Sequence, residues 1–292
     1  MRNLIIEDTS LVVVICGLVM LLILSSSMPI RPQMWIYPFV RYAAQVKVDV
    51  ETRHMAVHET EHFRIKYTLA DADTVDMIAQ AAEAAYFPVT RQFNYAPQSK
   101  TLILVQPNKN ELRQAFGWSG NESAMGVYWG GAIQLLSPHV WLSGGDSVEE
   151  FIHSGPMVHE YTHLVFDYLT NGNYPRWFTE GLAQYVEYRV NDYEWQTKTN
   201  TFDGKLYTMA ELEGDFDHLP NQSLAYRQSL GAVRYINEVY GEDALGAIIA
   251  DLKNGRQLEN AIQKRIGLDY PAFESSWQEW AVKNMDHHTE KE

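Results

Sequence analysis

The chain has 292 residues, enough for one large domain or two small ones, and its 46% hydrophobic and 21% charged residues indicate a globular rather than a disordered protein. Its formal net charge of −14, from 23 Lys and Arg against 37 Asp and Glu, argues against a nucleic-acid-binding protein and against polybasic binding to anionic lipid. The one cysteine, Cys16, excludes an intrachain disulfide and a structural zinc site built on cysteines.

The N-terminal segment contains an apolar run, Leu11–Leu24, without a single polar side chain. A membrane span needs about 20 residues, and the flanking Thr9, Ser10 and Ser25–Ser27 extend the run to that length. Residues 1–28 therefore predict either one uncleaved transmembrane helix, which we favour, or a secretory signal that is cleaved near the three serines.

Residues 29–60 predict a stem that lies along the membrane or along the domain, because prolines alternate there with aromatic residues (Pro29, Pro32 and Pro38). Three histidines at four-residue spacing, His54, His58 and His62, would share one face of a helix. No acidic residue or cysteine completes an obvious metal site there, so we expect a solvated helix or the entrance to a strand.

A domain over residues 61–286 follows, and its first half is rich in strands. Alternation predicts a strand over residues 63–67, and apolar spacing predicts a helix over 73–93 that Pro88 bends or splits. Further along the chain we expect a buried strand at 101–106, a short helix at 108–116 and a hairpin over 124–136 around Gly130 and Gly131.

The second half of the domain is helical. Gly, Pro and Asn separate predicted helices near residues 147–153, 156–170, 175–191, 221–240, 242–253, 256–266 and 270–284. Strands first and helices second indicate an α+β fold. Residues 287–292 form a charged tail.

An HExxH sequence at residues 159–163 carries the clearest chemistry. On a helix, His159 and His163 lie on one face, so both imidazoles can reach one zinc ion. Glu160 is offset by one residue, and it can therefore hold and deprotonate a water that the metal activates.

A third ligand follows on the next predicted helix. Sixteen residues separate His163 from Glu180, and the turn at residues 171–175 lets the second helix fold back so that Glu180 faces the histidines. Two histidines and one glutamate leave the fourth tetrahedral position open, which is typical of a catalytic zinc site.

The chain resembles the gluzincin metallopeptidases in the paired helices that carry their zinc ligands. The resemblance is carried by HEYTH (159–163), the sixteen residues between His163 and Glu180, and WFTEGLAQYVE (177–187). The similarity is strongest to the bacterial peptidase MA-like families and more distant to the membrane-alanyl aminopeptidase family, and it covers roughly residues 60–285.

The resemblance implies a zincin-like fold, in which a small mixed sheet with helices and a helical C-terminal lobe flank the active site. It implies that His159, His163 and Glu180 bind one zinc ion, that Glu160 is the general base, and that the substrate is a peptide or protein. It also implies a catalytic domain outside the cytoplasm, tethered to the cell membrane or secreted after signal cleavage. The alternative is a catalytically silent, zinc-bearing domain that binds peptides or acts as a sensor.

The chain also departs from the aminopeptidases. Those enzymes carry a Gly-Ala-Met-Glu-Asn element whose Glu binds the substrate amine, whereas this chain has Gly126 at the corresponding position. We therefore expect an endopeptidase, in which the strand at 125–129 pairs with an extended substrate. Tyr226 is the candidate to stabilise the transition state, with His218 the weaker one. Asp167 is expected to orient a histidine or to point to solvent.

Overall fold

The computed structural model describes residues 33–118, 124–142 and 147–286. The predicted anchor or signal at 1–28 and the charged tail at 287–292 lie outside these ranges. Within the ranges, none of the helices combines the length and the apolar character that a membrane crossing requires.

A mixed five-stranded sheet forms the first half of the fold, with strand order β1-β2-β3-β5-β4. Its strands are β1 (Ala56–Glu59), β2 (Phe63–Tyr67), β3 (Thr101–Gln106), β4 (Gly126–Trp129) and β5 (Ala132–Leu136). The strands β2, β3 and β5 run parallel, and β1 and β4 are antiparallel edges. The strands predicted at 63–67 and 101–106 and the hairpin over 124–136 are confirmed. The strand β4 therefore lies at one edge of the described sheet.

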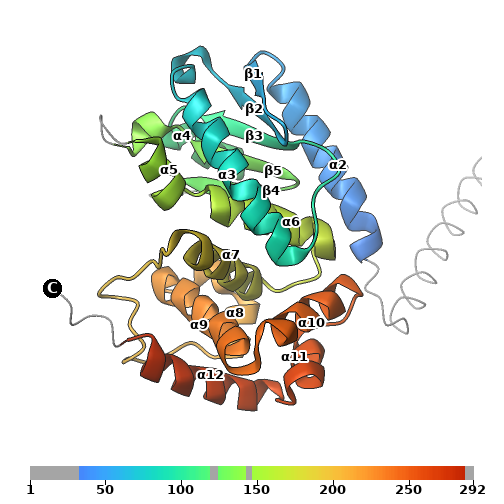
Figure 1. The fold of residues 1–292 in the computed structure, drawn as a ribbon, viewed down its shortest axis with the longest axis vertical. Helices are drawn as coiled ribbons and strands as arrows, with labels where there is room; N and C mark the ends of the chain where they lie inside the picture. Colours follow the sequence, from blue (N-terminus) through green and yellow to red (C-terminus); the bar gives the residue numbers. More distant parts are fainter. Residues whose placement is uncertain (1–32, 119–123, 143–146, 287–292) are drawn as a thin grey trace, which may run out of the picture.

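Helices surround this sheet (Figure 1). They are α2 (Gln33–Glu51), α3 (Val75–Phe93), α4 (Lys109–Phe116), α5 (Val148–Ser154) and α6 (Met157–Thr170), with short 3₁₀ turns at Leu69–Asp71 and Pro138–Val140. Pro88 does not split α3, although it removes a helical hydrogen bond. The neighbouring Ala85 and Val89 are fully buried, and this packing offsets the loss.

The part of the predicted stem that the structure describes lies against the domain. Residues 33–51 form α2, and residues 56–59 join the sheet as β1. Of the two expectations for His54, His58 and His62, the entrance to a strand is confirmed and the shared helix face is not, because His58 lies in β1 and His62 directly precedes β2. The backbone hydrogen bonds between β1 and β2 outweigh the helical tendency that the four-residue histidine spacing suggested.

The second half of the fold is helical, as predicted (Figure 1, lower part). It contains α7 (Arg176–Asn191), α8 (Met209–Gly214), α9 (Gln222–Tyr240), α10 (Glu242–Lys253), α11 (Leu258–Ile266) and α12 (Tyr270–Asn284), with a 3₁₀ turn at Phe216–His218. Only the short α8 was not predicted. A Cβ at Gly181 would lie 2.3 Å from the Ser229 carbonyl oxygen, so this glycine permits the close approach of α7 and α9.

Candidate metal centre

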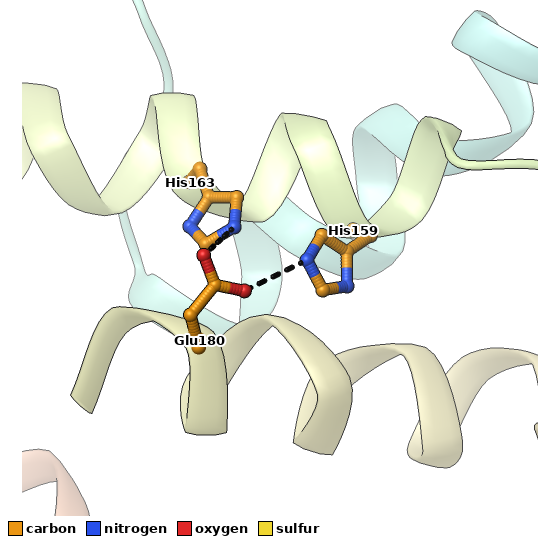
Figure 2. A group of neighbouring side chains, drawn as sticks. All are labelled: His159, His163 and Glu180. Atoms are coloured by element: carbon orange, nitrogen blue, oxygen red, sulfur yellow. Dashed lines mark hydrogen bonds and ion pairs between the residues drawn. The ribbon is translucent and has the colours of Figure 1, made fainter. Parts of the chain in front are cut away.

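Two consecutive helices carry the HExxH sequence and the third candidate ligand. The helix α6 ends at Thr170, and Asn171 and Gly172 follow with positive φ of 50° and 73°. This left-handed turn reverses the chain, and α7 begins directly after Pro175. His159 and His163 on α6 and Glu180 on α7 consequently point toward one another (Figure 2).

The donor atoms of His159, His163 and Glu180 all lie within 4.8 Å of one another. The Nε2 atom of His159 is 3.2 Å from Glu180 Oε2, and that of His163 is 3.4 Å from Glu180 Oε1. Tetrahedral zinc, with ligand bonds of 2.0–2.2 Å, places its donors about 3.3–3.6 Å apart. Two imidazole nitrogens and one carboxylate therefore fit a zinc ion and leave one coordination position for another molecule.

The other ring nitrogen of each histidine has its own partner. His163 Nδ1 lies 2.8 Å from Thr179 Oγ1, and His159 Nδ1 lies 3.3 Å from Glu187 Oε2. Contacts of this kind set the ring orientation and leave Nε2 for the metal. Sequence reasoning missed both partners. Glu187 is seven residues after Glu180 and so lies on the same helix face, and this spacing could have predicted its contact with His159. No sequence pattern near Thr179 predicted its contact with His163.

Glu180 is buried, with a side chain only 2% exposed. The Nη1 atom of Arg176 lies 2.5 Å from Oε1 of Glu180. Burial alone would raise the pKa of Glu180, but the charges of Arg176 and His163 hold this pKa well below its usual range. Burial alone would lower the pKa of His159, but hydrogen bonds that its ring donates to the carboxylates of Glu180 and Glu187 raise this pKa. The site thus presents a carboxylate anion. Arg176, which also contacts Asp217, was not predicted to lie here.

Glu160 lies beside this group rather than within it. Its Oε2 accepts a 2.6 Å hydrogen bond from the backbone N–H of Tyr128 in β4. Burial raises the pKa of Glu160, which the two histidines partly counter. A Cβ at Gly126 would lie 2.7 Å from Glu160 Cγ, so the glycine gives the side chain its space. The edge strand thereby positions the carboxylate.

The two candidate transition-state stabilisers differ in their surroundings. The ring of Tyr226, on α9, packs between Trp195 and Phe216. Burial and the charge of Glu180 raise the pKa of Tyr226, with a smaller contribution from Glu160, so its hydroxyl stays protonated near these carboxylates. His218 instead has a side chain that is 81% exposed and pairs with Asp215. His218 does not join the group.

Asp167 neither orients a histidine nor points to solvent, so that prediction is wrong. It is fully buried and accepts hydrogen bonds from Tyr128 Oη at 2.6 Å, Tyr174 Oη at 2.8 Å and Arg41 Nη1 at 2.9 Å. Asp167 therefore joins α6 to α2 and to the strand that carries Tyr128. The sequence could not reveal this because Arg41 is 126 residues away.

Comparison with known proteins adds a family match. The family model described as the peptidase MA superfamily matches residues 129–283, more than half of the chain. The chain is also similar to the uncharacterized protein YhcO of Bacillus subtilis (strain 168), with 21% identity over 285 residues that cover 92% of this chain and 85% of the relative. The matched range includes His159, His163 and Glu180.

Proposed function

The chain belongs to the peptidase MA superfamily, and from this we propose that it is a zinc-dependent metallopeptidase of the gluzincin type. The observation that carries the proposal is the convergence of His159, His163 and Glu180, with Glu160 held beside them. In this proposal the fold is zincin-like, and the active site lies between the sheet region and the helical region.

The protein groups have distinct parts in the proposed reaction. A zinc ion bound by the two histidines and Glu180 would polarise the scissile carbonyl and lower the pKa of a water toward about 7. Glu160 takes a proton from the attacking water and later passes it to the leaving nitrogen. The Tyr128 N–H holds Oε2 of Glu160, so Oε1 is left to face the water. The Tyr226 hydroxyl donates to the developing oxyanion.

We favour an endopeptidase over an aminopeptidase. Gly126 occupies the place where the aminopeptidases carry the glutamate that binds the substrate amine, and even a Cβ at this place would meet Glu160. The position of β4 at the edge of the sheet suits an extended peptide that passes through the site. We further propose that residues 1–28 tether the domain to the extracytoplasmic face of the cell membrane.

Metal content and peptide cleavage test the proposed function. The purified full chain should contain about one zinc ion per molecule and cleave denatured casein, and a chelator should abolish cleavage. Glu160→Gln should keep the zinc and lower the rate by at least about 100-fold, because it removes the general base. Glu149→Gln, an exposed carboxylate at the start of α5, serves as the matched control and should change neither.

Two results would count against this mechanism. A zinc-loaded chain that binds casein without chelator-sensitive cleavage would instead support the silent peptide-binding domain. A Glu160→Gln variant with normal activity would show that another group acts as the base.

A further inference from the structure

The helix α2 carries an exposed apolar stripe on its outer face. The stripe consists of Trp35, Phe39, Tyr42, Val46 and Val50. Trp35, Phe39 and Tyr42 are 70%, 74% and 68% exposed. The spacing of four, three, four and four residues places all five side chains on one side of the helix. Ile36 and Val40 widen the same face, with exposures of 61% and 54%.

The opposite face of α2 is fastened to the domain, so the outer stripe cannot turn inward. Arg41 pairs with the buried Asp167 at 2.9 Å. Gln45 donates to the Gly131 carbonyl oxygen at 2.9 Å and to the Tyr168 hydroxyl at 2.8 Å. These contacts reach the β4–β5 hairpin and α6. Figure 1 shows α2 running along the side of the sheet region.

The chain that precedes α2 indicates what covers the stripe. Eight residues, 25–32, separate the end of the apolar run Leu11–Leu24 from Gln33, where α2 begins. The nine Cα–Cα steps from Leu24 to Gln33 span at most about 32 Å. If the run enters a bilayer, the first turn of α2 must therefore lie close to that bilayer. A helix of 19 residues is about 28 Å long, so it can lie along the surface over its full length.

The chemistry of α2 also fits a lipid interface. Trp and Tyr favour the headgroup level of a membrane, and Phe and Val favour the acyl boundary below it. The helix carries two cationic residues, Arg41 and Lys47, and two anionic ones, Asp49 and Glu51, so its formal charge cancels. The protein as a whole is at −14. Attraction to the bilayer must then come from apolar burial rather than from charge.

We propose that the outer stripe of α2 lies in the interface of a lipid bilayer, making α2 an interfacial helix fixed to the domain by its inner face. Because Arg41 joins α2 to Asp167 on α6, this contact sets the orientation of the metal-site helix relative to the membrane. The proposal concerns only the position of α2, and it stands apart from whether the chain cleaves peptides.

Site-directed spin labelling of the full chain tests the proposal. Cys16→Ser removes the one cysteine, after which Val46→Cys in the stripe and Val282→Cys on α12 accept nitroxide labels. The two valines are a matched pair because they are 43% and 42% exposed. In phosphatidylcholine vesicles, the ratio of collisions with oxygen to collisions with a nickel chelate should be several-fold higher at position 46 than at 282. A label introduced by Phe39→Cys should behave like the one at 46.

Each other outcome overturns the proposal. A chain that does not float with the vesicles, or labels at 39 and 46 as exposed to the nickel chelate as the label at 282, would mean that α2 faces water. A label shielded from both reagents would mean that protein covers the stripe, either residues 11–24 or a second copy. Phosphatidylglycerol should not increase binding, and a strong increase would indicate an electrostatic contact instead.

Discussion

At the scale of single residues, the position of Glu160 depends on Gly126, which has no side chain. Gly126 leaves the space that the Glu160 carboxylate needs, since a Cβ there would come within 2.7 Å of Glu160 Cγ and 3.0 Å of Pro156 Cβ. Pro156 precedes α6 and its ring cannot rotate away, so Glu160 must move. Displacing a group that acts on the attacking water by about 1 Å can cost about 100-fold in rate.

Gly126→Ala is therefore expected to lower kcat by about 10-fold to 100-fold while zinc content stays normal. Steady-state cleavage of a peptide, with metal analysis of the same sample, measures both quantities. Gly246→Ala is the control, because it lies exposed in α10 with no atom near its Cβ, and it should leave kcat unchanged. Equal kcat for wild type and Gly126→Ala would show that β4 does not constrain Glu160.

At the scale of elements, α2 is attached to α6 by a buried ion pair. Arg41 and Asp167 have side chains that are 10% and 0% exposed, and Asp167 also accepts from two tyrosine hydroxyls. Removing one partner of a buried pair leaves an uncompensated charge, which typically costs about 3–5 kcal/mol.

Arg41→Ala should accordingly lower the free energy of unfolding by about 3 kcal/mol, measured by urea denaturation. Lys47→Ala on the same helix removes an exposed pair with Glu51, whose side chains are 70% and 61% exposed, and should cost at most about 0.5 kcal/mol. If the two variants lose equal stability, the Arg41–Asp167 pair does not hold α2 in place.

A second pair of elements, α10 and α11, is joined by Asp251. Hydrogen bonds from Arg265, at 2.7 and 3.0 Å, lower the pKa of Asp251 to about 2, with help from Lys264. Its pKa in the folded chain is thus below that of the unfolded chain. The stabilisation is present above about pH 4 and is lost as the pH falls toward 2.

Asp251→Asn should lower the free energy of unfolding by about 2 kcal/mol near neutral pH, and this difference from wild type should shrink on acidification. Denaturation curves across the acid range measure it. Glu279→Gln, in an exposed pair with Lys283, should show little change at any pH. A difference for Asp251→Asn that does not depend on pH would contradict the role of its charge.

At the scale of the whole molecule, the candidate metal centre links the two halves of the fold. His159 and His163 come from α6, which packs under the sheet, whereas Glu180 comes from α7, which packs against α9. A metal bound by all three therefore stabilises the packing of the sheet region on the helical region. Binding to the folded chain adds about 2.7 kcal/mol at a free ligand concentration 100 times Kd.

Added zinc should raise the Tm of the metal-free chain, and His163→Ala should abolish this rise. Differential scanning calorimetry of the full chain measures both. His139→Ala is the control, because this exposed histidine pairs with Asp73 outside the centre, and its zinc response should match that of wild type. A normal rise in the His163→Ala variant would place the zinc elsewhere.

By itself, the sequence determined the features that depend on short-range periodicity. Alternation predicted β2, and four-residue spacing placed His159 and His163 on one face of α6. The turn predicted after Thr170 reversed the chain direction, so that Glu180 could face His159 and His163. These features follow from helix and strand geometry over a few residues, and the family resemblance rested on the same segments.

Only the tertiary structure decided which distant groups meet. The attachment of α2 to α6, the hydrogen bond from Tyr128 to Glu160, and the burial of Asp167 against Arg41 all depend on contacts across 32 to 126 residues. The packing of the sheet and helices as a whole selects such pairings, because every buried charge and every buried backbone amide needs a hydrogen-bond or ion-pair partner in the same folded arrangement. No local pattern encodes them, so the position of the candidate base and the exposed outer stripe of α2 emerged only from the folded chain.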